Sequence, residues 1–353
     1  KISHQRKMKK YVVLAAAIAM VAFAGCKKEE KGLVTLKIGT ENVASNSKEA
    51  YEADYSRILF EAGDGIYING VEGYVTPLNG DPDPYTTDYY SFKAQIDVAP
   101  SAVSGQEFTA VYPGADQGIM FEDGLYTCEF ISTPGLIPEV RVSGHSMGVG
   151  IYQPWPMVAH YTCGSCVLED GRFVMKNAVA VLTPSILYGA TWFNEMANRF
   201  SFPTASPDEL PEIYVDGVDI MSSTIPLYGN AHLENLDTDA PIAVINDGEG
   251  FDGGVSTVNA YASGEGFGYS LSPQFVGELP IAPFTGRGEL TMNMYFHFDW
   301  YGNTYYFVYH GERCIVPEYT LRRGVRTILQ VNMRDNHLDD VPTNEYMGRF
   351  MLL

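Results

Sequence analysis

Residues 289–300 read Glu-Leu-Thr-Met-Asn-Met-Tyr-Phe-His-Phe-Asp-Trp, and this stretch decides the class of fold. Every second residue from Leu290 to Trp300 is apolar, whereas the residues between them carry polar groups. A period of two is typical of a β-strand with one buried face. Gly302-Asn303 and a second aromatic run follow, so the stretch predicts the first strand of a hairpin.

The same period recurs along the chain. It appears near the N-terminus in residues 34–38 and near the C-terminus in residues 325–333. Asn69-Gly70 is a strong hairpin signal. No long stretch has the 3.6-residue period of a helix, although residues 191–199 fit one short helix. The pattern predicts an all-β protein of antiparallel sheets packed as sandwiches.

Length and composition predict two such sandwiches. The chain has 353 residues and 46% hydrophobic content, which is about twice the length of a typical domain. A Pro-rich segment and a Cys pair lie between residues 156 and 177 and mark the expected boundary. We expect an N-terminal sandwich over residues 33–165 and a C-terminal one over residues 166–353.

The beginning of the chain has the features of a lipoprotein leader. Met8-Lys9-Lys10 is positively charged, residues 11–23 carry no charge, and Ala24-Gly25 precedes Cys26. A run of this length is too short to span a bilayer. The alternative, a buried core helix, would need polar residues on one face, and the run has none.

The leader predicts where the chain is processed and anchored. We expect residues 1–25 to be a signal peptide, Cys26 to carry the lipid (palmitate), and residues 26–32 to form a tether. Residues 1–7, ahead of Met8, read as upstream translation. Lys27-Lys28-Glu29-Glu30 resembles the signal that sends Bacteroidetes lipoproteins to the outer face of the outer membrane, so the expected location is the cell surface.

Charge excludes two classes of partner. The net charge is −20, and removal of the basic leader makes it more negative. Nucleic acid and anionic lipid surfaces are poor partners for such a chain.

One motif suggests catalysis, but its context does not. Gly144-His145-Ser146-Met147-Gly148 matches the G-x-S-x-G nucleophile elbow of hydrolases. That elbow needs a helix directly after the Ser, and Pro154 and Pro156 exclude one here. We therefore interpret the segment as a glycine-rich loop and expect no catalytic residue.

Metal and disulfide sites are not expected either. Cys163 and Cys166 have C-x-x-C spacing, but Cys128 and Cys314 are isolated, so neither a zinc set nor an obligatory disulfide is predicted. Residues 246–254 are acidic and glycine-rich but fit no calcium-loop register, so we expect a surface loop, no metal and no cofactor. An aromatic sugar platform remains an alternative for three residues, Trp155, Trp192 and Trp300.

Several strand segments, taken in order, resemble the fimbrillins, the type V pilin family of the Bacteroidetes. The resemblance covers essentially the whole chain after the leader. Two positions depart from the family pattern, since Phe60 stands where Trp is common and Phe23 where Leu is common. The segments that carry the resemblance are residues 60–70, Tyr112-Pro113, residues 156–159, residues 225–229, residues 279–283 and residues 323–326.

The resemblance implies a structural role. It implies two transthyretin-like β-sandwich domains in tandem and assembly into fimbriae, with other fimbrial subunits, a trypsin-like maturation protease and an outer-membrane lipid anchor as partners. The protease would cut after Lys48 or Arg57, and we favour Lys48 because its surroundings are more polar. The cut would displace the first strand, whose shared face holds Val34, Leu36 and Ile38.

Displacement of the first strand would open a hydrophobic groove, which the C-terminal strand of another subunit would then fill. Tyr346, Phe350 and Leu352 share one strand face and form the expected donor strand. The alternative is a last strand docked on its own domain. The alternative function is a monomeric surface lipoprotein, or a fimbrial tip or anchor, that binds glycan or a host protein through exposed aromatic residues of the second domain.

Overall fold

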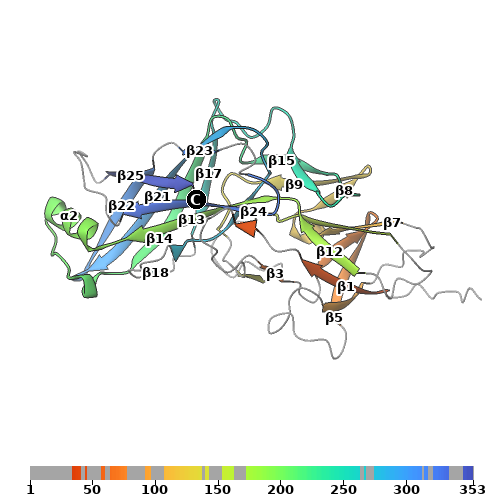
Figure 1. The fold of residues 1–353 in the computed structure, drawn as a ribbon, viewed down its shortest axis with the longest axis horizontal. Coiled ribbons are helices and arrows are strands. Elements are labelled where there is room, and N and C mark those ends of the chain that lie inside the picture. Colours follow the sequence, from red (N-terminus) through yellow and green to blue (C-terminus); the bar gives the residue numbers. More distant parts are fainter. Residues whose placement is uncertain are drawn as a thin grey trace, which may run out of the picture.

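The computed structural model describes residues 34–40, 44–45, 57–59, 64–77, 92–96, 107–136, 140–142, 153–162, 172–262, 266–267, 274–311, 314–316, 321–333 and 345–352. Strands dominate these residues, as the sequence predicts. Figure 1 shows the strands of a large sheet and helix α2 toward one end of the molecule, and the strands of a barrel toward the other.

The barrel is a closed ring of strands. All its pairs are antiparallel except β1 with β12. The ring order is β1 (Val34–Thr40), β12 (Arg172–Asn177), β11 (Met157–Thr162), β7 (Glu107–Tyr112), β4 (Gly65–Ile68), β5 (Val71–Pro77) and β6 (Phe92–Ile96). Asn69 and Gly70 both have positive φ and join β4 to β5, so the predicted hairpin is confirmed.

The large sheet runs through most of the C-terminal half of the chain. Its path is β17 (Ser256–Tyr261), β14 (Ile213–Ser222), β21 (Gly288–Trp300), β22 (Asn303–Gly311), β25 (Glu345–Leu352), β24 (Val325–Met333), β13 (Ala180–Tyr188) and β19 (Gln274–Phe275). Short strands β2 (Ala44–Ser45), β18 (Gly266–Phe267), β20 (Leu279–Ile281) and β23 (Cys314–Val316) pair along it.

Two smaller sheets complete the fold. One has the order β16 (Ile242–Ile245), β15 (Gly229–Glu234), β9 (Leu125–Phe130) and β8 (Met120–Glu122). The other pairs β3 (Arg57–Leu59) with β10 (Val140–Val142) in parallel. The short helices η1 (Ala115–Gln117) and η3 (Pro207–Glu209) lie in connections.

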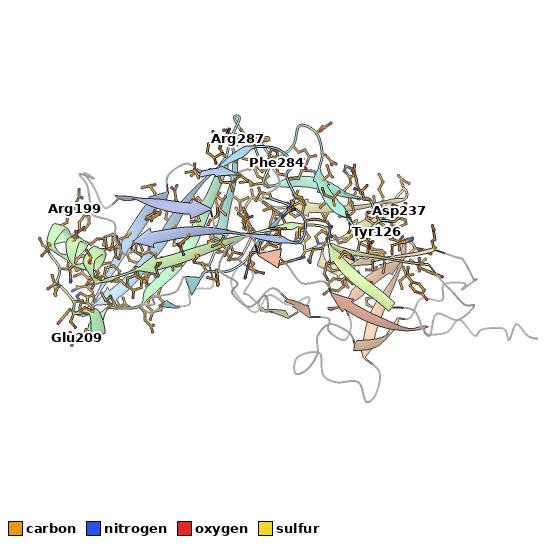
Figure 2. The ribbon with its side chains drawn as sticks, in the orientation of Figure 1. Tyr126, Arg199, Glu209, Asp237, Phe284 and Arg287 are labelled. Carbon is orange, nitrogen blue, oxygen red and sulfur yellow. The ribbon has the colours of Figure 1, made fainter. Side chains whose placement is uncertain are left out.

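Helix α2 (Ala190–Phe200) confirms the predicted short helix. It follows β13 directly and packs its apolar face, including Trp192, Phe193 and Met196, into the core. Arg199 and Glu209 lie at this end of the molecule, whereas Tyr126 and Asp237 lie toward the barrel (Figure 2).

Strand β21 also behaves as its sequence predicts. Its alternate residues from Leu290 to Phe298 are buried, and Trp300 lies at the rim of the core. The turn into β22 is formed by Tyr301 and Gly302, which both have positive φ, so Asn303 already belongs to the strand. Among the described strands, five pairs are parallel. Alternation cannot predict this, because it reports the faces of a strand and not its direction.

The described residues form two hydrophobic cores that meet in β13. Val179 and Val181 belong to the first core, and Ala180 and Leu182 belong to the second. The boundary at residues 165 and 166 stays a prediction, and in the described strands β12 lies in the barrel while β13 lies in the large sheet. Strands β15 and β16 also contribute to the first core although they come later in the chain.

Candidate strand-exchange site

The first strand closes the barrel. Strand β1 lies between β6, which it meets from Val34↔Ile96 to Ile38↔Phe92, and β12, which it meets from Lys37↔Arg172 to Thr40↔Met175. Strands β6 and β12 do not pair with each other in the ring. Loss of β1 would therefore leave two open strand edges facing one gap.

The segment after β1 contains strand β2, which pairs with the large sheet. In β2, Ala44 and Ser45 pair in parallel with Val325 and Arg326 of β24. The described residues that precede the candidate cleavage positions thus contact both the barrel and the large sheet. The sequence does not indicate β2, because a two-residue strand has no readable period.

The candidate processing residues are only partly described. Arg57 is the first residue of β3 and pairs with Val140, in agreement with the expectation that it can begin a strand. Lys48 and Cys26 lie outside the described residues. The assignment of cleavage and lipidation to these residues remains a prediction.

The C-terminal strand β25 pairs with two strands of its own chain. Strand β25 pairs in parallel with β22, where Tyr346 is in register with Tyr309. It pairs antiparallel with β24, where Phe350 is in register with Val331 and Leu352 with Leu329. This is the arrangement that the docked-strand alternative expects. The donor role stays a proposal, and it requires β25 to leave these partners.

Strands β2 and β25 share one edge of β24. Strand β13 pairs with β24 from Arg326 to Met333 and so occupies the opposite edge. On the shared edge, β2 covers residues 325–326 and β25 covers residues 329–332. Strand β2, which follows β1, and the C-terminal strand β25 therefore lie against neighbouring parts of the same strand.

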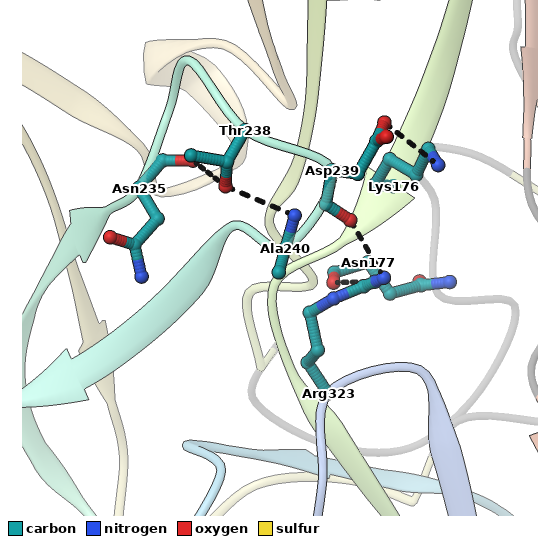
Figure 3. Close-up of polar contacts among 7 residues, drawn as sticks. All are labelled: Lys176, Asn177, Asn235, Thr238, Asp239, Ala240 and Arg323. Carbon is teal, nitrogen blue, oxygen red and sulfur yellow. Dashed lines mark hydrogen bonds and ion pairs between the residues drawn. The ribbon is translucent and has the colours of Figure 1, made fainter.

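A set of polar contacts joins the barrel to the large sheet where β12 ends (Figure 3). Arg323 donates from Nη1 to the carbonyl oxygen of Asn177 and from Nη2 to that of Asp239, each at 3.0 Å. Lys176 forms an ion pair with the Asp239 carboxylate at 3.3 Å. Trp155, which is 1% exposed, donates from Nε1 to Asn177 Oδ1 at 2.6 Å. We call Trp155, Lys176, Asn177, Asp239 and Arg323 the joint.

Three of the segments quoted for the family resemblance, residues 60–70, Tyr112-Pro113 and residues 156–159, meet in the barrel. Tyr112 donates its hydroxyl hydrogen to the buried Asp64 carboxylate at 3.0 Å, and Tyr112 is paired with Met157 of β11. Tyr112 and Asp64 are both buried, so this hydrogen bond satisfies polar atoms inside the core.

The residues considered for other chemistry offer no assembled site among those described. Ser146, Cys163 and Cys166 lie outside the described residues. Trp155 and Trp192 are buried, which does not suit a sugar platform, and Trp300 donates from Nε1 to the Pro203 carbonyl oxygen at 2.7 Å. In the acidic loop of residues 246–254, Glu249 accepts hydrogen bonds from the backbone and side chain of Asn230. No group of three or more His, Cys, Asp or Glu suited to a metal ion occurs in the described part of the chain.

The thiol of Cys128 is expected to be unreactive in the folded chain. Cys128 is buried in the first core, and burial raises the pKa of its thiol to about 12. At pH 8 the thiol is therefore protonated, and the protonated form is a poor nucleophile. Peptide mass mapping after iodoacetamide at pH 8 should find Cys128 unmodified in the native chain and fully modified in urea. Equal modification in both conditions would contradict the buried position.

Comparisons with known proteins give structural likenesses only. No family model matches the chain, and no curated protein matches it. A fimbrial protein from Bacteroides vulgatus ATCC 8482 is 12% identical with a TM-score of 0.44, and the match covers 87% of this chain and 97% of that one. A candidate cell adhesion protein from Bacteroides ovatus ATCC 8483 is 13% identical with a TM-score of 0.39, covering 85% and 92%. A fimbrial assembly protein from Parabacteroides distasonis ATCC 8503 is 8% identical with a TM-score of 0.33, covering 87% and 93%.

Where the structure describes the chain, it contains no helix long and apolar enough to cross a membrane.

Proposed function

We propose that this chain is a structural fimbrial subunit, exported as a surface lipoprotein and polymerised by proteolysis-triggered strand exchange. The observation that carries the proposal is the position of β1. It is the first described strand, it closes the barrel between β6 and β12, and it precedes both candidate cleavage residues. A single cut after Lys48 or Arg57 would separate it from the rest of the fold.

The physical reason for exchange lies in the edges that a cut uncovers. Open strand edges carry unpaired N–H and C=O groups, and an added strand satisfies them while its alternate side chains refill the core. By the alternation of the sequence, Val34, Leu36 and Ile38 are expected on one face of β1, and Tyr346, Phe350 and Leu352 on one face of β25 with the same period. The β25 strand of another subunit therefore has the same apolar alternation as β1 and could take the place that β1 leaves.

The lipid anchor fits the same scheme. Attachment at Cys26 would hold the precursor at the outer membrane through the segment that contains β1 and β2. A cut after Lys48 would release the subunit from its anchor and uncover the barrel gap in one step. It would also remove β2 from the edge of β24.

Limited proteolysis tests this function. The full chain is treated briefly with a trypsin-like protease and examined on an unheated denaturing gel, with N-terminal sequencing of the products. We expect a ladder of resistant oligomers with new termini after Lys48 or Arg57. Lys48→Gln and Arg57→Gln, singly and together, identify the cut, and the double variant should give neither cleavage there nor a ladder.

The contrary result is a clean cut that yields monomer alone. It would favour the second candidate function, a solitary binding lipoprotein or a fimbrial tip or anchor protein that recognises glycan or a host protein. The observation that favours this candidate is the exposure of aromatic residues at the hairpin of β21 and β22, where Tyr301 in the turn is 72% exposed and Tyr306 in β22 is 68% exposed.

A further inference from the structure

The outer surface of four neighbouring strands of the large sheet combines aromatic rings with carboxylates. Strands β17, β14, β21 and β22 contain no lysine and no arginine. Their alternate residues fill the second core, so the remaining side chains point outward. We call this surface the tyrosine face and define it by Tyr214, Asp216, Asp219, His297, Asp299 and Tyr306.

An aromatic row crosses three of these strands. Tyr214 of β14 is in register with His297 of β21, which is in register with Tyr306 of β22. The rings of Tyr214 and His297 stack with centroids 5.2 Å apart and planes 13° apart. The His297 and Tyr306 rings follow at 5.4 Å. The row therefore offers an outward-facing aromatic surface, with Tyr306 as its most accessible member.

The carboxylates beside this row are held by hydrogen bonds from a histidine and a threonine, and not by lysine or arginine, among the described residues. The imidazole Nδ1 of His297 lies 2.9 Å from Asp216 Oδ1, and the Thr304 hydroxyl donates to Asp299 at 2.6 Å. Among the described residues, neither aspartate forms an ion pair with lysine or arginine. Their negative charge is therefore available to a partner.

Asp219 is held in the same way, further along β14. Asn259 Nδ2 donates to its Oδ1 at 2.6 Å and the Tyr295 hydroxyl donates to its Oδ2 at 2.5 Å. The hydrogen bond to Asp219, together with desolvation, raises the pKa of Tyr295 to about 12. The tyrosine thus remains a neutral donor at physiological pH.

A β-bulge sets the position of Asp216. The register between β14 and β21 shifts between Val215 and Gly217, so Asp216 has no partner in the ladder. A Cβ at Gly217 would lie 2.9 Å from the carbonyl oxygen of Ala260, so glycine is needed for this close approach. Bulges often redirect a side chain at a functional site, and this one places the Asp216 carboxylate beside the His297 ring.

We propose that the tyrosine face binds a cationic segment of a partner polypeptide, whose arginine or lysine side chains lie over the aromatic row and pair with Asp216 and Asp299. Charge complementarity selects this occupant, since the four strands lack cations and the chain carries a net charge of −20. Guanidinium groups stack on aromatic rings and form hydrogen bonds with carboxylates at the same time. A second copy of this acidic chain is disfavoured by the same charge. The proposal goes beyond the fimbrial role and does not depend on strand exchange.

Titration with a fluorescein-labelled octa-arginine peptide tests the proposal. Binding to the full chain is followed by fluorescence anisotropy at low and at physiological ionic strength. We expect Tyr306→Ala to weaken binding at least fivefold, and the double variant Asp216→Asn/Asp299→Asn to do the same. The matched control is Asp237→Asn/Asp247→Asn, which removes equal charge from exposed loop positions and should weaken binding less than twofold.

Three outcomes would overturn the proposal. They are equal weakening by the control and the Asp216→Asn/Asp299→Asn pair, unchanged binding by Tyr306→Ala, and binding of a neutral oligosaccharide in place of the peptide. Because Tyr306 is an exposed side chain, Tyr306→Ala should keep the native fold, which circular dichroism checks. Tyr306→Phe preserves the ring and is expected to bind like the parent chain.

Discussion

Deletion of residues 345–353 is expected to abolish the resistant oligomers and to destabilise the uncleaved chain. In the uncleaved chain, β25 pairs on both sides, with β22 and with β24, and its loss leaves two open edges inside the large sheet. Each backbone hydrogen bond contributes roughly 0.5–1.5 kcal/mol net, so we expect the free energy of unfolding to fall by several kcal/mol. Urea denaturation measures the second effect, and the proteolysis gel measures the first.

Two neighbouring substitutions separate a donor strand from a merely structural one. By the alternation of the sequence, Phe350 is expected on the same strand face as Tyr346 and Leu352, and Met351 on the opposite face. Phe350→Lys should suppress the ladder much more strongly than Met351→Lys. A ladder that survives the deletion of β25 would rule out this strand as the donor, and it would leave the docked-strand arrangement as its role.

Replacement of Trp155 by alanine is expected to lower the free energy of unfolding by about 3–5 kcal/mol. Trp155 is 1% exposed, belongs to the first core, and donates a hydrogen bond to Asn177 at the joint. The substitution leaves a large cavity and removes one contact that fixes the end of β12. Since a domain is stable by only about 5–15 kcal/mol, the effect should be large in urea denaturation followed by circular dichroism.

Trp155→Phe provides the matched control. It keeps most of the buried aromatic volume and loses the indole donor, so its cost should be clearly smaller, about 1–3 kcal/mol. If Trp155→Ala lowered the free energy of unfolding by less than 1 kcal/mol, the result would contradict the buried position of Trp155 in the first core. Equal costs for both substitutions would mean that the hydrogen bond to Asn177 dominates.

The period of apolar residues in the sequence predicted those elements that have one buried face and one more exposed face. Strand β21 was readable because its inward residues lie in the second core and its outward residues form part of the tyrosine face. Helix α2 was readable for the same reason. Strand β13 is buried at every position, so its pattern carries no period and only an apolar run marks it.

Pairing between distant segments could not be predicted from the sequence. Nothing in residues 229–245 indicates that β15 pairs with β9, about a hundred positions earlier in the chain. The strand-exchange residues were identified by alternation and by resemblance, whereas their partners β6, β12, β22 and β24 follow only from the fold. The joint and the bulge at Asp216 also depend on contacts between segments that are distant in the sequence, which a local pattern does not contain.

The shared burial of β13 has a consequence for how this chain unfolds. Successive residues from Val179 to Leu182 alternate between the two cores, so neither core can lose its packing without exposing side chains on the same strand. Parallel pairing of β13 with β24 along eight residue pairs extends this link through the large sheet. The two halves should therefore melt in one cooperative transition, with a single calorimetric peak, and a destabilising change in the barrel should lower the melting temperature of the large sheet equally.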